Sequence, residues 1–127
     1  MNWRVIYYEM QDGQCPVQEF IDSRSHRDQA KVLSWIAQLE EHGPTLPRPY
    51  ADLLDEGVHE LRVSLSGDPI RVLYFFCYRH YIVLTHTFAK NTQKVPRGQI
   101  TRALRAQRDF LIRFDEETLK EELDEDL

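Results

Sequence analysis

The sequence predicts an α+β domain: an N-terminal strand and two helices, then a mostly antiparallel sheet of three sequential strands and a C-terminal helix. Two observations predict it. Apolar residues recur at helical spacing within residues 25–42 and again within 97–114, whereas residues 58–88 form short strand-like runs joined by tight turns. We assign residues 1–114 to this domain and residues 115–127 to an acidic C-terminal tail.

The first part of the chain is expected to supply one strand and two helices. Residues 3–8 have the β-rich composition of a short strand. Pro16 suits the first turn of a short helix. Ser25 can cap a second helix with Asp28 at its N3 position, and Gly43 ends that helix.

Residues 44–58 are expected to cross irregularly from the second helix to the sheet. They hold three prolines and one glycine, which exclude a long regular element. Leu53 and Leu54 are an apolar pair in this segment, and we expect both to pack into the core.

Alternation along the strands predicts which residues share a face of the sheet. In the strand at 58–65, Glu60 and Arg62 lie opposite the apolar side chains. In the strand at 81–88, one face is expected to carry four residues: Ile82, Leu84, His86 and Phe88. We interpret His86 as a structural histidine whose hydrogen bonds are satisfied.

The strand at 70–78 is almost entirely apolar except for Arg71, which makes this arginine the strongest indication of function. A guanidinium in a central strand is costly unless something uses its charge. The neighbouring antiparallel strand could place Arg62 on the same face, if the register allows. The segment after the last strand then adds Lys90 and Lys94.

Two guanidiniums and two ammoniums would suit a phosphodiester. The fork of an arginine matches the non-bridging phosphate oxygens, and fixed positive charge stabilises a pentacovalent phosphorane. RNA supplies its own nucleophile, the 2′-hydroxyl, so such a ribonuclease needs proton transfer and charge stabilisation but no metal or other cofactor. The alternative is structural: Arg62 pairs with Glu60 or Asp68, and Arg71 extends to a sheet edge.

Charge is unevenly distributed along the chain. Residues 115–127 carry eight acidic residues and one lysine, whereas residues 60–114 carry ten basic and three acidic residues. The basic part favours an anionic partner. The arginines of the last helix also fit an ordinary solvated surface, and we expect the acidic tail, which has little to bury, to be solubilising.

The sequence lacks the motifs that are typical of several classes of protein. There is no glycine-rich phosphate loop, HExxH pair, GxSxG elbow or paired-cysteine motif, so no metal is expected. No apolar run approaches the roughly 18–20 residues that span a bilayer. No secretory signal is visible either, so we expect a cytoplasmic protein without membrane contact.

The combination of Glu60-Leu61-Arg62, Arg71 before an aromatic strand, and the run from Phe88 to Pro96 resembles the RelE/ParE toxin superfamily, most closely its HigB-like, phage-derived branch. The resemblance covers about residues 50–114. It implies the toxin of a type II toxin–antitoxin pair, a metal-independent endoribonuclease that cuts mRNA on the ribosome and inhibits translation. The implied partner is a cognate antitoxin, a small helix-turn-helix protein. Within the same fold, the alternatives are a ParE-like gyrase inhibitor and a non-catalytic protein that binds RNA or a partner.

The resemblance also implies site residues. Arg62 matches the basic position of the first motif, Arg71 matches the arginine before the aromatic strand, and Lys90 and Lys94 match the lysine-rich segment; these four are the expected catalytic residues. Asn91 stands where the family usually has a second consecutive basic residue, which predicts reduced activity or a larger share for the lysines. The expected RNA contacts are Asn91, Thr92, Gln93, Arg97, Arg102 and Arg105.

Overall fold

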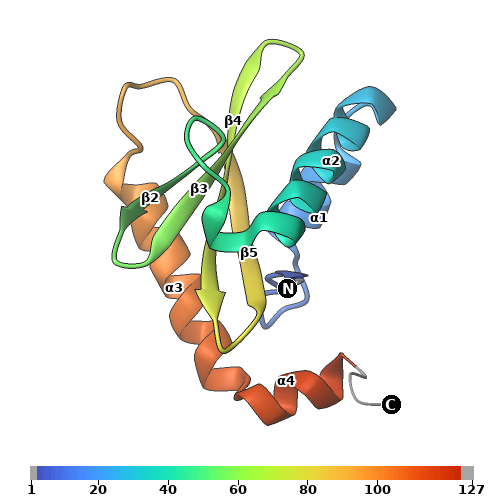
Figure 1. Ribbon diagram of the computed structural model, residues 1–127, viewed down its shortest axis with the longest axis vertical. Coiled ribbons are helices and arrows are strands. Elements are labelled where there is room, and N and C mark those ends of the chain that lie inside the picture. Colours follow the sequence, from blue (N-terminus) through green and yellow to red (C-terminus); the bar gives the residue numbers. More distant parts are fainter. Residues whose placement is uncertain (1–2, 124–127) are drawn as a thin grey trace.

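The computed structural model describes residues 3–123 and shows an α+β fold in which helices cover both faces of one sheet (Figure 1). The sheet has five strands in the order β1-β5-β4-β3-β2. Its strands are β1 (Arg4–Tyr7), β2 (Ala51–Asp55), β3 (Val58–Leu65), β4 (Asp68–Cys77) and β5 (Tyr81–Ala89). The helices are α1 (Pro16–Asp22), α2 (His26–His42), the 3-10 turn η1 (Gly43–Thr45), α3 (Arg97–Arg113) and α4 (Glu116–Glu122).

The general class is as predicted, and most of the sheet is antiparallel. Only β1 runs parallel to its neighbour β5, whereas β2, β3, β4 and β5 pair antiparallel in sequence. The hydroxyl of Ser25 caps α2 as expected, because it accepts a hydrogen bond from the backbone N of Asp28 at 3.2 Å. Within residues 3–123, no helix combines the length and the apolar character needed to cross a bilayer.

The additional strand β2 lies in the segment that we expected to be irregular. Its prolines all precede residue 51, so the strand keeps the backbone N–H groups that pair with β3. The expectation for Leu53 was wrong: this side chain is 57% exposed, whereas Leu54 packs against the core on the α3 side. Consecutive residues of a strand point to opposite faces, so both leucines could not enter the same core.

A β-bulge at Thr85 changes the faces of β5. Leu73 lies opposite His86 and Tyr74 lies opposite Leu84, which leaves Thr85 as an extra residue between the two pairs. The prediction that four β5 residues share a face was therefore wrong. They are divided two and two: Ile82 and Leu84 pack with α1 and α2, and His86 and Phe88 lie on the α3 side.

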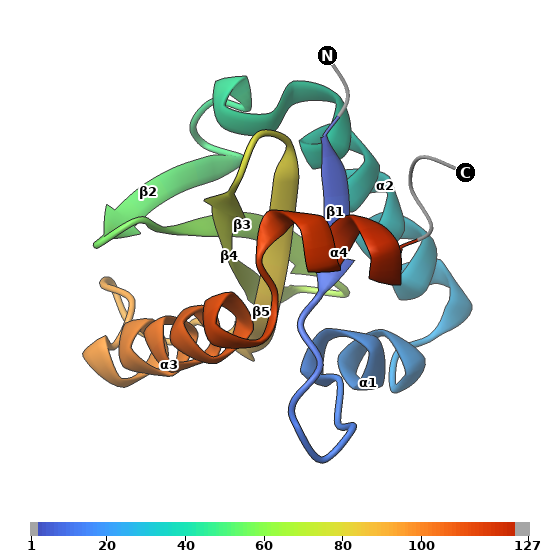
Figure 2. The same cartoon turned by 90° about the horizontal axis from the view of Figure 1, so that it is seen from below.

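Residues 115–123 pack more tightly than their composition suggests, and the rest of the predicted tail lies outside the described residues. Asp115 caps α4 by accepting a hydrogen bond from the backbone N of Thr118 at 2.7 Å. Leu119 is only 2% exposed and joins the core cluster that contains Tyr8 and Phe110. Figure 2 shows α4 turning back from the end of α3 toward β1. The expectation that this tail has little to bury was therefore wrong for Leu119.

Candidate functional site

β3 and β4 place Arg62 and Arg71 directly opposite each other. Cross-strand partners in an antiparallel pair point to the same face of the sheet. That face is the α3 side, because Leu73, two residues beyond Arg71, packs with Ile100 and Ala103 of α3. The register therefore brings together the two arginines that the sequence predicted could share a face.

Glu60 lies on the same face and pairs with both arginines. Its Oε2 accepts hydrogen bonds from Nε and Nη2 of Arg62 at 3.2 and 3.0 Å, and its Oε1 lies 3.1 Å from Nε of Arg71. The contact with Arg71 is an ion pair whose alignment does not meet hydrogen-bond geometry, so neither of its two buried atoms has a hydrogen-bond partner among residues 3–123. Glu60 is 2% exposed, and a carboxylate so deeply buried is tolerated because it is paired.

This pairing supports part of the structural alternative considered from the sequence. Arg62 does pair with Glu60, whereas Asp68 pairs with Arg24 at 3.4 Å. Arg71 does not simply extend to a sheet edge, because its side chain is 14% exposed and contacts Glu60. Sequence reasoning had considered Glu60 only as a partner of Arg62, since a single charge in an alternating strand does not reveal that two arginines surround it.

The charges continue toward the edge strand β2. Asp52, the cross-strand partner of Glu60, lies 3.5 Å from Nη2 of Arg62 and accepts a hydrogen bond from Nε of Arg48 at 2.9 Å. That hydrogen bond from Arg48 is the main reason why the pKa of Asp52 is lowered. In the part of the chain from 3 to 123, no three His, Cys, Asp or Glu side chains are grouped so that they could hold a metal ion.

The formal charges of this cluster leave it weakly positive: the guanidiniums of Arg48, Arg62 and Arg71 exceed the carboxylates of Asp52 and Glu60 by one. Arg71 also donates from Nη1 to the carbonyl oxygen of Ile70 at 3.1 Å. Its Nη2 makes no hydrogen bond within the described chain. This nitrogen is therefore the part of Arg71 that remains available to a ligand.

Lys90 and Lys94 lie in the loop that leaves β5 and leads to α3 (Figure 1). The backbone N of Lys90 donates to the carbonyl oxygen of Pro69 at 2.8 Å, so the contact between these two strands continues to Lys90. Lys90 comes two residues after Phe88, which is the cross-strand partner of Arg71. Neither lysine side chain forms a hydrogen bond or ion pair with another residue of the described chain. Both ammonium groups are therefore free to meet an external anion.

The residues predicted to contact RNA fall into three groups: one in the loop after β5, one at the start of α3 and one farther along α3. Asn91, Thr92 and Gln93 are exposed in the same loop, where the hydroxyl of Thr92 donates to the carbonyl oxygen of Lys94 at 2.5 Å. Arg97, by contrast, is paired: Nη1 contacts Asp55 and Nη2 contacts Glu56, each at 2.6 Å. These contacts tie the start of α3 to the turn between β2 and β3.

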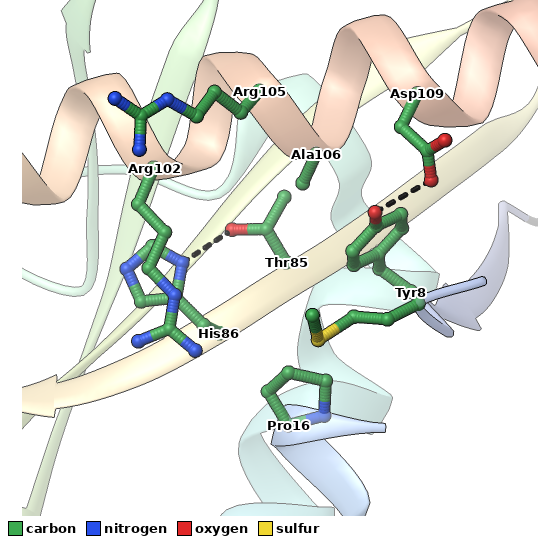
Figure 3. Close-up of a pocket in the computed structure, with 9 residues that line it drawn as sticks. Tyr8, Pro16, Thr85, His86, Arg102, Arg105, Ala106 and Asp109 are labelled. Atoms are coloured by element: carbon green, nitrogen blue, oxygen red, sulfur yellow. Dashed lines mark hydrogen bonds between the residues drawn. The ribbon is translucent and has the colours of Figure 1, made fainter. Parts of the chain in front are cut away.

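Arg102 and Arg105 lie farther along α3, beside a groove that the sequence did not reveal (Figure 3). The central hollow of this groove has a volume of about 440 Å³ and lies between α3, β5 and the segment that joins β1 to α1. Its lining includes Tyr8, Met10, Pro16, His86, Arg102 and Arg105. None of Glu60, Arg62 and Arg71 lines this groove, which lies over β5, whereas the Glu60 cluster lies on β3 and β4.

His86, at the floor of this groove, is structural, as predicted. Its ring nitrogens lie 3.0 Å from Oγ1 of Thr85 and 2.9 Å from Oε1 of Gln99, so both are satisfied. Burial, supported by the nearby charge of Arg102, lowers the pKa of His86 to about 4. The ring is therefore neutral at pH 7 and, by donating from Nε2 to Gln99, connects β5 to the first turn of α3.

Comparison with known protein families gives a match over most of the chain. A family model with the description "Phage derived protein Gp49-like (DUF891)" matches residues 19–108. The matched region contains Glu60, Arg62, Arg71 and both lysines of the loop after β5. A search among curated proteins found no match.

Proposed function

Because the chain belongs to the Gp49-like family of phage-derived proteins, we propose that it is the toxin of a type II toxin–antitoxin pair. This family is associated with toxin–antitoxin toxins of the RelE-like type. Within that class we propose a HigB-like, ribosome-dependent mRNA endonuclease that inhibits translation. Its partners would be mRNA on the ribosome and a small helix-turn-helix antitoxin.

The arrangement of Glu60 between Arg62 and Arg71 is the observation that carries this proposal. The carboxylate holds both guanidiniums in place before any ligand arrives. Charge that is fixed in advance needs no reorganisation when a phosphate develops extra negative charge, so it stabilises the transition state efficiently. Arg71 keeps Nη2 unbonded for this purpose, and Lys90 follows the strand that pairs with it.

The proposed reaction is a transesterification within the message. The 2′-hydroxyl gives its proton to water as its oxygen attacks the adjacent phosphorus, the bond from phosphorus to the 5′-oxygen breaks, and the departing 5′-oxygen takes up a proton, so the products end in a cyclic phosphate and a 5′-hydroxyl. Arg71, supported by Arg62, contacts the non-bridging oxygens, and Lys90 with Lys94 stabilises the departing oxygen or assists its protonation. Glu60 is buried, so we assign it the role of positioning the arginines.

The test compares the parent protein with two variants during expression and maps new 5′ ends in ribosome-bound message by primer extension. The parent should arrest growth and cut the message, and Arg71→Ala should abolish both effects. Arg71→Ala also removes a partner of buried Glu60, so its thermal unfolding must be measured in parallel. The variant Lys90→Gln/Lys94→Gln should keep the fold intact, because neither lysine side chain makes a hydrogen bond or ion pair with another residue in 3–123.

The same experiment separates the alternatives. If both variants arrest growth and cut the message as strongly as the parent, the site assignment is wrong. If the message stays intact while cleaved gyrase–DNA complexes accumulate, the protein is a gyrase inhibitor instead.

One observation favours a second candidate, a non-catalytic RNA-binding protein of the same fold. Glu60 and Asp52 already neutralise much of the charge of Arg62, and Asn91 stands where a basic residue is usual in similar proteins. Binding to programmed ribosomes without new 5′ ends would support this candidate over the endonuclease.

A further inference from the structure

The groove between α3, β5 and the segment from Tyr8 to Pro16 takes no part in the proposed cleavage. Two further hollows, of about 360 and 340 Å³, adjoin the central one. Met10 lines all three hollows, Arg102 lines two of them, and Asp109 also lines two. The shared residues make one elongated groove rather than three separate pockets.

The middle of the groove is positively charged. Arg102 and Arg105 are exposed, lie one turn apart on α3, and form no ion pair or side-chain hydrogen bond with a described residue (Figure 3). Like charges three residues apart on a helix repel each other. The carboxylate of Asp109, in the same lining, is already engaged by Tyr8 and Arg113, each at 2.6 Å. Both guanidiniums are therefore available to an anionic group from outside.

Carboxylates lie at both ends of the groove, at one end beside Arg102. Glu19 lines one outer hollow, and Asp12 with Asp109 lines the other. A polyanion such as RNA, laid along the groove, would meet carboxylates on both sides of the two arginines. The aromatic rings of the central hollow, Tyr8 and His86, are buried, so they offer no open face on which a base could stack.

The walls of the central hollow suit apolar side chains. Met10 is partly exposed there, and Pro16 and Ala106 complete an apolar surface beside the arginines. The groove therefore presents a short positive centre, apolar walls and a carboxylate at each end. This pattern is complementary to a peptide that carries carboxylates at its centre between apolar residues.

We propose that this groove is the docking site for a segment of a partner protein, with one or two adjacent carboxylates between Arg102 and Arg105 and apolar side chains on Met10 and Pro16. Sequence reasoning had assigned both arginines to RNA, and the charge pattern reassigns them to a protein. If the chain is a toxin as proposed above, the antitoxin is the partner expected to carry this segment. The docking site itself does not depend on RNA cleavage, because none of Glu60, Arg62 and Arg71 lines the groove.

The test selects random dodecapeptides displayed on phage against the immobilised full-length protein and measures binding of the selected peptides by fluorescence anisotropy. Selected peptides should share an acidic residue flanked by apolar ones. The variant Arg102→Gln/Arg105→Gln should weaken their binding by about tenfold or more, because it removes two charge-assisted contacts. Arg108→Gln is the matched control. Arg108 is exposed on the same helix, makes no ion pair or side-chain hydrogen bond with the described part of the chain and does not line the groove, so this variant should bind like the parent.

Several results would overturn the proposal: no enrichment over the bare support, selected peptides without acidic residues, or equal binding to the parent and Arg102→Gln/Arg105→Gln. A uridylate octamer is tested in parallel. The groove is an RNA surface, and the proposal is wrong, if the octamer binds the parent and Arg102→Gln/Arg105→Gln weakens this binding whereas Arg108→Gln does not. Arg71→Ala protein should bind the peptides like the parent, so a failure of the proposed endonuclease activity remains distinguishable.

Discussion

Oε1 of Glu60 and Nε of Arg71 lie 3.1 Å apart across the pairing of β3 and β4. This contact explains how a central, otherwise apolar strand tolerates a guanidinium, because the buried carboxylate compensates its charge. Arg62 contacts the other oxygen of the same carboxylate, so one glutamate holds two arginines on one face of the sheet. The stability of the domain and the geometry of the proposed site therefore depend on the same residue.

Replacing Glu60 with glutamine should destabilise the protein, because Arg71 then loses its carboxylate partner near the core and Arg62 keeps only the longer contact with Asp52. The expected loss is about 3 kcal/mol in the free energy of unfolding, which urea denaturation at neutral pH measures. Glu41→Gln, at an exposed position of α2, is the control and should stay within about 0.5 kcal/mol of the parent. A Glu60→Gln protein as stable as the parent would show that the carboxylate charge does not hold the arginines.

Asn91→Lys should increase cleavage if the proposed endonuclease is correct. Asn91 is exposed in the loop after β5, so an added ammonium costs little to place. One cation that acts directly on the phosphorane contributes on the order of 2–4 kcal/mol, so a rise of about tenfold or more in cleavage is expected. Primer extension on ribosome-bound message measures the change.

The control for this prediction is Gln93→Lys, which adds the same charge two residues farther along the loop. If both variants raise cleavage equally, the added charge acts by general attraction of RNA and not at the position of Asn91.

The buried histidine predicts a pH dependence of stability. The pKa of His86 is lowered to about 4 in the folded protein, mainly by burial, whereas an unfolded histidine titrates near 6.5. The unfolded chain therefore binds more protons between these values, so the contribution of His86 to stability is complete above about pH 6.5 and falls as the pH drops toward 4. The full effect is about 3 kcal/mol, taken from the difference of the two pKa values.

Urea denaturation of the parent and of His86→Gln at several pH values checks this dependence. Carboxyl groups that titrate in the same range contribute to both proteins, so the difference between the two curves isolates His86. Between about pH 6.5 and 4, the free energy of unfolding should depend more steeply on pH in the parent than in His86→Gln. Parallel curves would contradict a neutral, buried ring.

Leu119→Ala should destabilise the domain by roughly 2–3 kcal/mol, since the leucine is almost completely buried against Tyr8 and Phe110. Ile112→Ala is the control, because Ile112 is 78% exposed and should cost less than about 0.5 kcal/mol. Thermal denaturation of both variants measures the difference. Equal effects would mean that α4 does not contribute to the core.

Local patterns in the sequence determined a large part of this structure. The helical spacing of apolar residues and the capping motif predicted α2 with its cap at Ser25. The alternation of side chains along the strands predicted that Arg62 and Arg71 could share a face. These features depend on residues close in sequence or on neighbouring strands joined by a short turn. The motifs on which the family resemblance rested, between Glu60 and Pro96, lie within the region that the Gp49-like model matches.

Other features were decided only by how the elements pair and pack against one another. The bulge at Thr85 depends on how β5 pairs with β4, and it moves His86 and Phe88 to the α3 side. The burial of Glu60 and Leu119, and the groove beside Arg102, each require elements far apart in the chain to meet. A sequence pattern reports the faces of one element, but the burial and pairing of a side chain depend on the elements that pack against it.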